Sequence, residues 1–275
     1  MGTLYVVATP IGNLSDMTPR AIQTLQDVDL IAAEDTRHSG RLLKHFAIET
    51  PMISYHLHNR ASRESDLIAR LATQDVALIS DAGTPAIADP GAELVAAAIA
   101  AGIRVVPIPG ASSMVAAVSA AGLIDSPFFY LGFLPRVAHE RRLLLGKAAR
   151  AESALVLFES PLRLRETLIE LSELLGDRSA TVARELTKLH EEFVHGTLSV
   201  LAARYADQPP KGEIVIVVGA PHGGLIERDS SEDVIRKLLN DGLRPSKAAR
   251  EASAILGISG AEAYDLVRKF AEDQL

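Results

Sequence analysis

The first half of the chain alternates short apolar runs with longer segments of helical character. The runs are rich in Val and Ile, which is typical of strands buried on both faces. They occupy residues 4–8, 28–33, 51–55, 76–80 and 104–108. Between them, Thr18 and Asp89 each precede a first-turn proline, and Gly102 stands where a helix end is expected. This order predicts an open parallel sheet within a domain of residues 1–125.

The pattern changes after residue 125. Further strand-like runs occupy residues 128–133, 154–159, 180–185, 190–196 and 213–219. The third and fourth of these runs lie too close in sequence for a crossover helix, so they are expected to pair as antiparallel neighbours. We therefore expect a second, mixed α/β domain over residues 126–220.

Residues 226–275 have a helical pattern. A first helix begins near Ser246 and ends at Gly257, and Ser259 with Glu262 forms a capping box before a second helix. Helix, short glycine turn and helix resemble a helix-turn-helix unit, although a plain helical appendage has the same pattern. The expected fold is thus two α/β domains followed by a small helical module.

The amino-acid composition excludes several classes of site. The chain has 275 residues, of which 48% are hydrophobic, and it contains no cysteine. Disulfides, thiol nucleophiles and thiolate metal ligands are therefore excluded. The longest apolar stretches, "LVAAAIAAGI" and "MVAAVSAAGLI", are too short to span a bilayer, so we expect a cytoplasmic protein. The net charge of -7 does not favour nucleic-acid binding from composition alone, which makes local basic patches important.

Polar side chains gather at the predicted strand ends of the first sheet. Loops at the carboxyl edge of a parallel sheet meet, and ligands of open α/β folds bind there. Glu34, Asp35 and Arg37 follow the second strand, and Asp81 is the first residue past the fourth. The role of Asp35 could be limited to capping the following helix. That role would explain one residue of the group but not the others. Four loops of this kind on one edge favour a binding site.

Common nucleotide and metal motifs are absent from the sequence. Gly12 stands alone where a G-x-G-x-x-G fingerprint needs three glycines, and there is no G-x-x-x-x-G-K-[ST] loop. His56 and His58 alternate along an extended segment, so their side chains would point to opposite faces. We expect no metal site.

A basic run lies in residues 135–150 and includes Arg136, Arg141 and Arg142. Such a run is compatible with a solvated helix face. It is also compatible with a patch that contacts the phosphates of a nucleic acid.

Nine motifs in order resemble a known family. They are "TPIGNLSD", "AEDTRHSGRLL", "YHLHN", "SDAGTPAIADPG", "PGASS", "FLPR", "FESPLR", "RELTKLHEE" and "KGEIVIV". Together they resemble the ribosomal RNA small subunit methyltransferase I family, a branch of the tetrapyrrole methylase superfamily. The resemblance covers nearly the whole chain, including the C-terminal helices.

The resemblance implies an activity and its partners. It implies transfer of a methyl group from S-adenosyl-L-methionine to the ribose 2′-hydroxyl of a cytidine in the decoding region of 16S rRNA, within the 30S subunit. It also implies a tetrapyrrole-methylase-like fold, with the cofactor in a cleft between two α/β domains, and a homodimer. The alternatives are a tetrapyrrole or diphthine-type methylase of the same superfamily and a non-catalytic rRNA-binding assembly factor.

The resemblance also assigns candidate residues. In the superfamily, a "GDPxxx" loop touches the cofactor, and Thr84 stands here where the tetrapyrrole enzymes carry Asp. The cofactor-binding candidates are Pro10, Gly12, Ala82, Gly83, Thr84, Ile87, Ser112, Ser113, Leu131 and Leu186. The candidates for the general base are Asp35, Asp81 and Glu34. The candidates for substrate binding are Arg37, Arg136, Arg141 and Arg142.

Overall fold

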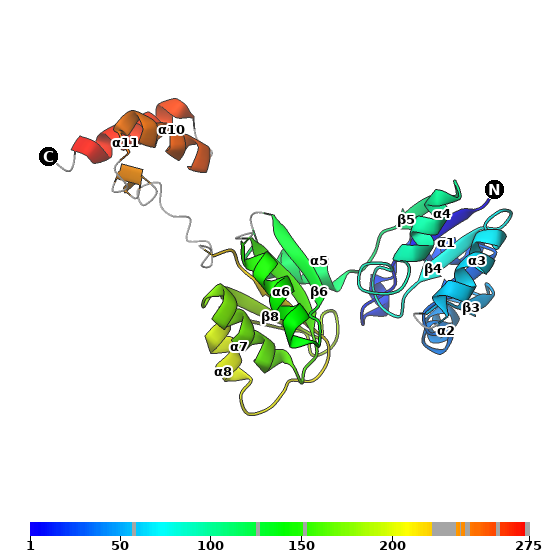
Figure 1. The fold of residues 1–275 in the computed structure, drawn as a ribbon. Helices are drawn as coiled ribbons and strands as arrows, with labels where there is room; N and C mark the ends of the chain where they lie inside the picture. The colour runs from blue at the N-terminus through cyan, green and yellow to red at the C-terminus, as the bar shows by residue number, and fades with distance from the viewer. Residues whose placement is uncertain are drawn as a thin grey trace. The chain divides into compact units, whose positions relative to one another are not determined.

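The structure is a computed structural model that describes residues 1–56, 59–124, 127–150, 153–221, 235–236, 238–239, 243–256 and 259–272. The chain divides into two compact units, Met1–His222 and Gly223–Leu275. The larger unit contains two five-stranded sheets and their helices (Figure 1).

Five parallel strands form the first sheet, in the order β3-β2-β4-β1-β5. They are β1 (Thr3–Val7), β2 (Leu30–Ala33), β3 (Met52–Ser54), β4 (Val76–Ile79) and β5 (Arg104–Ile108). One face packs against α1 (Pro19–Asp27) and α2 (Thr36–His45), and the other against α3 (Arg60–Arg70) and α4 (Ala92–Ala100). A short 3-10 helix, Leu14–Asp16, precedes α1. Because helices cover both faces of the sheet, both faces of each strand are buried and the strand sequences are continuously apolar. The predicted parallel sheet is confirmed.

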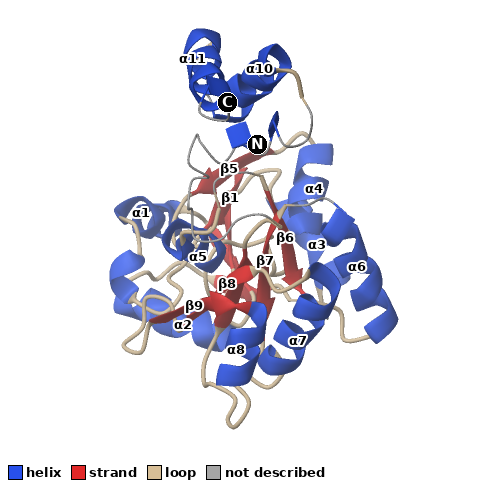
Figure 2. Ribbon diagram, turned by 90° about the vertical axis from the view of Figure 1, so that its left-hand side faces the viewer, coloured by secondary structure: helices blue, strands red, loops and turns tan. Residues whose placement is uncertain are grey.

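The second sheet is mixed and has the order β6-β7-β10-β8-β9. Its strands are β6 (Phe128–Phe133), β7 (Ala154–Glu159), β8 (Ser179–Arg184), β9 (Glu192–Thr197) and β10 (Ile214–Val218). The β6–β7 pair is parallel and the other pairs are antiparallel, including the predicted β8–β9 pair. One face packs against α6 (Ala138–Arg150), α7 (Leu164–Leu175) and α8 (Leu198–Arg204), as Figures 1 and 2 show. The expected mixed sheet is therefore confirmed.

The opposite face of the second sheet packs against α5 (Ser113–Ala121). Ala117 and Ala121 of this helix share a core with Val156, Val215 and Val217 of the sheet. By packing, α5 thus belongs with the second sheet although it precedes residue 125 in sequence. The domain limits 1–125, 126–220 and 226–275 stay predictions.

The smaller unit contains α10 (Pro245–Leu256) and α11 (Gly260–Glu272), which pack together through a core that includes Ala248, Ala252 and Val267. The Ser259 hydroxyl accepts the Glu262 N–H at 3.2 Å, and the Glu262 carboxylate accepts the Ser259 N–H at 3.0 Å. These reciprocal bonds confirm the predicted capping box.

The sequence also predicts helix ends at Thr18, Asp89 and Gly102. Those at Thr18 and Gly102 are confirmed, and the one at Asp89 is wrong. Thr18 caps α1 by accepting the Ala21 N–H at 3.1 Å, and Gly102 follows the end of α4 with a positive φ of 71°. Asp89 does not cap α4, because the cap residue is Gly91 and its φ of 141° turns the chain into the helix. The Asp89 side chain is therefore free for another role. Within the described ranges, no helix is long and apolar enough to cross a membrane.

Candidate functional site

The carboxyl edge of the first sheet has a switch point between β1 and β4. The chain leaves β1 toward α1 on one face of the sheet, and it leaves β4 toward α4 on the other face. Ligands of open α/β sheets bind at such points. Two backbone hydrogen bonds join the loops there, from Thr9 N to Gly83 O at 2.9 Å and from Gly83 N to Thr9 O at 3.0 Å. This bridge fixes the floor of a crevice.

The loop after β4 has an unusual backbone. Gly83 has a φ of 81°, and Ala86 has a φ of 66°, which is rare for a residue with a side chain. A Cβ at Gly83 would lie 3.2 Å from the Ile11 side chain, and one at Gly110 would lie 3.0 Å from Ala8 Cβ. These two glycines therefore allow close contact between neighbouring loops of the protein itself.

Two adjoining cavities lie beside this loop. The larger has a volume of about 370 Å³ and the smaller about 40 Å³. Both are lined by Ala82, Ala88, Asp89, Ser113 and Phe158. The larger volume falls in the range of small-molecule sites, roughly 300–1,000 Å³. The walls come from the first-sheet loops, the start of α5 and the second sheet.

Seven of the ten predicted cofactor residues line these cavities. The larger cavity is lined by Ala82, Ser113 and Leu186, and the smaller by Ala82, Gly83, Thr84, Ile87, Ser112 and Ser113. Ser112 also caps α5 by accepting the Val115 N–H at 3.5 Å. Thr84 donates its hydroxyl to the Ala111 carbonyl at 3.2 Å, so its oxygen helps to hold the two loops together.

Three predicted cofactor residues do not line either cavity. Pro10 and Gly12 flank Ile11, which does line the larger one. Gly12 instead faces Lys188, because a Cβ there would lie 2.4 Å from the Lys188 side chain. Leu131 packs against the helix-covered core of the second sheet. Contact between these three residues and a cofactor stays a prediction.

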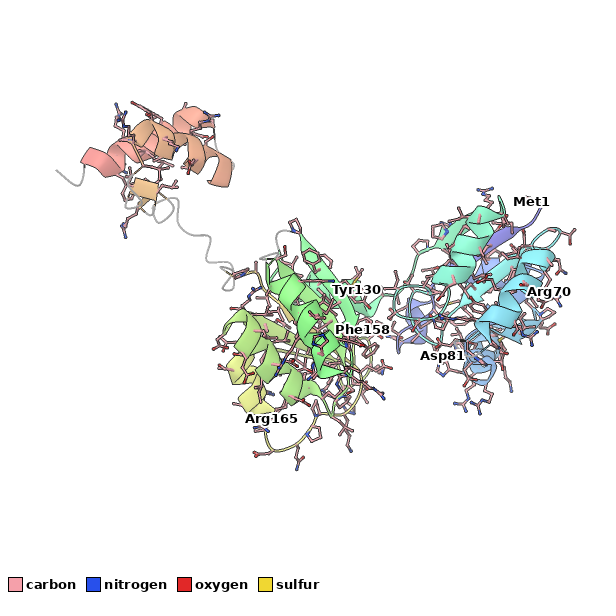
Figure 3. All side chains as sticks on the ribbon, in the orientation of Figure 1. Met1, Arg70, Asp81, Tyr130, Phe158 and Arg165 are labelled. Atoms are coloured by element: carbon pink, nitrogen blue, oxygen red, sulfur yellow. The ribbon has the colours of Figure 1, made fainter. Side chains whose placement is uncertain are left out.

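The second sheet supplies an aromatic wall. Phe133 and Phe158 line the larger cavity, with ring centroids 5.4 Å apart. Tyr130 lies against Phe158 at 5.4 Å, and Figure 3 shows these two side chains together on β6 and β7. A bulge between Tyr130 and Gly132 shifts the register of β6. It places Phe133 on the cavity side, where simple alternation would place residue 132.

The loop after β8 is strained where it meets the cavity. Glu185 and Thr187 have positive φ values of 51° and 66°, and they flank Leu186 on the cavity wall. Lys188 donates to Glu185 at 2.8 Å and to Glu213 at 3.1 Å. Backbone strain of this kind costs about 1–3 kcal/mol per residue and is found where function requires it.

The three predicted candidates for the base differ in environment. The Asp81 carboxylate accepts the Asp35 N–H at 3.0 Å, and the Glu34 carboxylate accepts the Asp81 N–H at 3.5 Å. Burial raises the pKa of Glu34, and the charges of Asp89 and Asp81 raise it further. Hydrogen bonds from Arg37 lower the pKa of Asp35 to about 2. Asp35 also caps α2 through the Arg37 N–H, at 2.8 Å.

Asp89 is a fourth carboxylate at the same place, and it lines both cavities. Burial raises its pKa, and the charge of Asp81 adds to this effect, while a hydrogen bond with Ser80 opposes it. Its only sequence signal was the following proline, which suggested a helix cap. No group of three or more His, Asp or Glu side chains in the described ranges could hold a metal ion. His58 lies outside the described residues.

The predicted basic residues also differ. Arg37 is exposed and pairs with Asp35 at 3.0 Å. The Arg141 side chain is only 12% exposed and pairs with Glu170 and Glu166. Arg136 and Arg142 are exposed. Of the basic run, these last two are thus the more accessible to a phosphate.

The class of the protein follows from this fold and from sequence comparison. A family model described as tetrapyrrole (corrin/porphyrin) methylases matches residues 3–202. Among solved structures, the chain resembles uroporphyrin III C-methyl transferase from Thermus thermophilus, with a TM-score of 0.56 and 18% identity over 80% of this chain and 98% of that one. It also resembles diphthine synthase, with a TM-score of 0.63 and 15% identity over 80% and 90%. These structural likenesses establish the fold.

Curated relatives specify the branch. The chain is 48% identical to the ribosomal RNA small subunit methyltransferase I of Synechocystis sp., over 99% of this chain and 100% of that one. It is 40% identical to the Bacillus subtilis protein of the same name, over 96% and 94%. The chain therefore belongs to the ribosomal RNA small subunit methyltransferase I family of the tetrapyrrole methylases.

Proposed function

We propose that this protein transfers the methyl group of S-adenosyl-L-methionine to the ribose 2′-hydroxyl of a cytidine in the decoding region of 16S rRNA. The observation that carries the proposal is the match to curated rRNA methyltransferases over nearly the full length of the chain. The match extends beyond the methylase domain at residues 3–202 into the C-terminal helices. The proposed substrate is the 30S subunit, the site of action is the cytoplasm, and the active form is a homodimer.

The cavities fit the cofactor in size and in character. A nucleoside joined to an amino acid needs apolar surface for its base and a few polar groups for its ends. Apolar surface is offered by Phe133, Phe158 and Leu186. Polar groups are offered by the Ser113 hydroxyl and the Ala82 backbone. Bound S-adenosyl-L-methionine would supply a methyl group that its sulfonium already makes electrophilic. The protein must then orient the ribose hydroxyl and accept its proton.

The test is a methylation assay with mapping of the product. The protein is incubated with labelled S-adenosyl-L-methionine and either 30S subunits or free 16S rRNA. We expect label on one ribose of a decoding-region cytidine. Label on a nucleobase, or label only on a tetrapyrrole or a protein side chain, would contradict the proposal. Binding of RNA without binding of the cofactor would indicate an assembly factor.

Two neighbouring arginines test the RNA-binding surface. Replacement of the exposed Arg142 by Ala should lower the slope of log K against log salt by about 1, because one phosphate contact is lost. Replacement of Arg141 should instead cost about 1–3 kcal/mol of stability, because Glu170 loses its buried partner. RNA binding measured between low and moderate salt, together with urea unfolding, separates the two effects. Equal salt slopes for R142A and wild type would exclude Arg142 from the interface.

A further inference from the structure

Asp89 holds a singular position among the carboxylates of the site. Five residues line both cavities, and Asp89 is the only ionisable one of the five. The smaller cavity is otherwise lined by the loop after β4, the start of α5 and Phe158, while the larger one opens toward the second sheet. A group at this junction can reach ligands that occupy either cavity.

The other two carboxylates of the larger cavity are already neutralised. Glu159 is 2% exposed, and its oxygens accept the Ser160 N–H and the Thr167 hydroxyl, both at 2.7 Å. The Arg163 guanidinium lies 3.5 Å from the same carboxylate. Glu213 pairs with Lys188 at 3.1 Å. Both carboxylates are therefore already engaged by partners within the protein.

Asp89, in contrast, lies near other acidic groups and has no cationic partner in the described part of the chain. Among the described residues, no lysine or arginine pairs with it, and a hydrogen bond with Ser80 is the one interaction that lowers its pKa. The titratable groups that face it are Glu34 at the end of β2, Asp81 in its own loop and Tyr130 on β6. Burial and the nearby charge of Asp81 both raise the pKa of Asp89. A proton acceptor works best with a pKa raised toward the working pH.

Tyr130 is a neutral neighbour of Asp89 on the second sheet. Its hydroxyl is buried and has no hydrogen-bond partner among the described residues. Burial together with the charge of Asp89 raises its pKa to about 12, so it stays protonated at neutral pH. A buried hydroxyl without a partner is costly. Tyr130 lines neither cavity, so it is not itself placed to meet a ligand there.

We propose that Asp89 is the catalytic base that accepts the proton of the attacking ribose hydroxyl, with Glu34 and Asp81 as positioning residues behind it. The proposal rests on the function proposed above. Glu34, Asp35 and Asp81 do not line either cavity, and Asp35 is held by Arg37. Asp89 is thus the carboxylate that combines cavity contact with an unneutralised charge.

The step balances without a further reactant. The hydroxyl oxygen forms the new O–C bond with one of its electron pairs, and the S–C bond breaks with its pair left on sulfur. The sulfonium becomes a neutral thioether. The hydroxyl proton passes to the Asp89 carboxylate, which becomes a neutral acid and later releases the proton to solvent.

The experiment compares D89N with wild type by three measurements. Calorimetry with S-adenosylhomocysteine should give affinities within about threefold of each other. Single-turnover methylation of 30S subunits at neutral pH should fall by about 10²–10⁴-fold. The rise of the wild-type rate with pH, through the raised pKa of Asp89, should be absent from D89N. D66N is the matched control, because Asp66 pairs with Arg70 on α3 at 3.1 Å, and it should behave like wild type.

A thermal scan gives a readout that does not depend on activity. Because the pKa of Asp89 is raised in the folded protein, its ionised form lowers the stability of that protein at neutral pH. D89N should therefore raise the Tm at neutral pH by about 1–3 °C. The gain should vanish as the pH falls below the ordinary value of 3.8, where both side chains are neutral.

Each failure has a distinct meaning. Transfer by D89N within tenfold of wild type would overturn the role of Asp89 while leaving the proposed function intact. A large loss of S-adenosylhomocysteine affinity in D89N would make Asp89 a cofactor ligand instead of the base. A lower Tm at neutral pH would point to a structural role. A wild-type protein that methylates no RNA would overturn both proposals.

Discussion

The two walls of the larger cavity are built from different chemistry. The first wall consists of loops from the parallel sheet and the start of α5, which also line the smaller cavity, and it includes Gly83, the hydroxyls of Ser112 and Ser113 and the carboxylate of Asp89. The second wall comes from the mixed sheet and presents the rings of Phe133 and Phe158 together with the carboxylates of Glu159 and Glu213. The first wall therefore offers a carboxylate without a cationic partner among the described residues, whereas the second offers aromatic surface and carboxylates that are paired with Arg163 and Lys188.

The walls also differ in what fixes their shape. The first is held by backbone features, namely the Thr9–Gly83 bridge and the positive φ of Gly83. The second is held by side-chain packing of the aromatic rings and by the strained Leu186 loop. We therefore expect substitutions in the second wall to cost more stability, because packing energy scales with the area that is lost.

The largest effect is expected at Phe158, which lines both cavities. Replacement by Ala removes a half-buried ring and its contacts with Tyr130 and Phe133. The free energy of unfolding should fall by about 3 kcal/mol. The affinity for S-adenosylhomocysteine should fall at least about tenfold, which corresponds to 1.4 kcal/mol. Urea unfolding and calorimetry measure the two quantities.

The control is F129A on the adjacent strand. Phe129 is 46% exposed and lines neither cavity, so its loss should leave cofactor affinity unchanged. Unchanged affinity in F158A would mean that the second wall does not contact the cofactor.

The contrast between the walls explains which parts of the site the sequence could predict. Local signals identified the first wall: the loop with Gly83 follows a buried strand, and Ser112 stands at a helix start. Capping signals of the same local kind located Thr18 and the Ser259–Glu262 box correctly. These features depend on residues within a few positions of each other, so a single sequence contains them.

The second wall depends on long-range geometry. Phe133 reaches the cavity because a bulge shifts the register of β6, and alternation alone cannot locate a bulge. Leu131, the predicted cofactor residue on this strand, packs toward the opposite, helix-covered face. Asp89 was interpreted as a helix cap because aspartate before proline is a typical cap signal. Its contact with two cavities requires the folded loop.

A smaller effect is expected at Gly83, in the first wall. Replacement by Ala should cost about 1–2 kcal/mol for the left-handed backbone. The new Cβ would also lie 3.2 Å from Ile11 and disturb the bridge between the two loops. We expect cofactor affinity to fall about tenfold, or 1.4 kcal/mol, as measured by calorimetry.

Gly102 provides a matched control for this backbone cost. It has a similar φ of 71°, and a Cβ there would meet nothing within 4 Å. G102A should therefore lose a comparable free energy of unfolding but keep full cofactor affinity. If G83A also kept full affinity, the loop after β4 would be a structural connection and not part of the cofactor site.

The smallest effects are expected from two adjacent carboxylates behind the first wall, Glu34 and Asp35, and these effects have opposite signs. The pKa of Glu34 is raised from 4.5 by burial and by Asp89 and Asp81, so ionised Glu34 opposes folding. E34Q should raise the Tm at neutral pH, and the gain should disappear as the pH falls below 4.5. Asp35 has a pKa lowered to about 2 by Arg37, so its charge favours folding. D35N keeps a capping oxygen but loses the ion pair, and it should lower the Tm slightly at any pH above 3.8.

The deficit of D35N should disappear as the pH falls from 3.8 toward 2, because wild-type Asp35 is then protonated. Thermal scans of both variants and wild type between pH 2 and pH 8 measure the two curves, at low salt, where surface charges act most strongly. A lower or unchanged Tm of E34Q at neutral pH would mean that Glu34 is not held against the Asp81 and Asp89 charges. In that case the electrostatic basis for a strong proton acceptor at this edge would be lost, whereas the aromatic second wall would be unaffected.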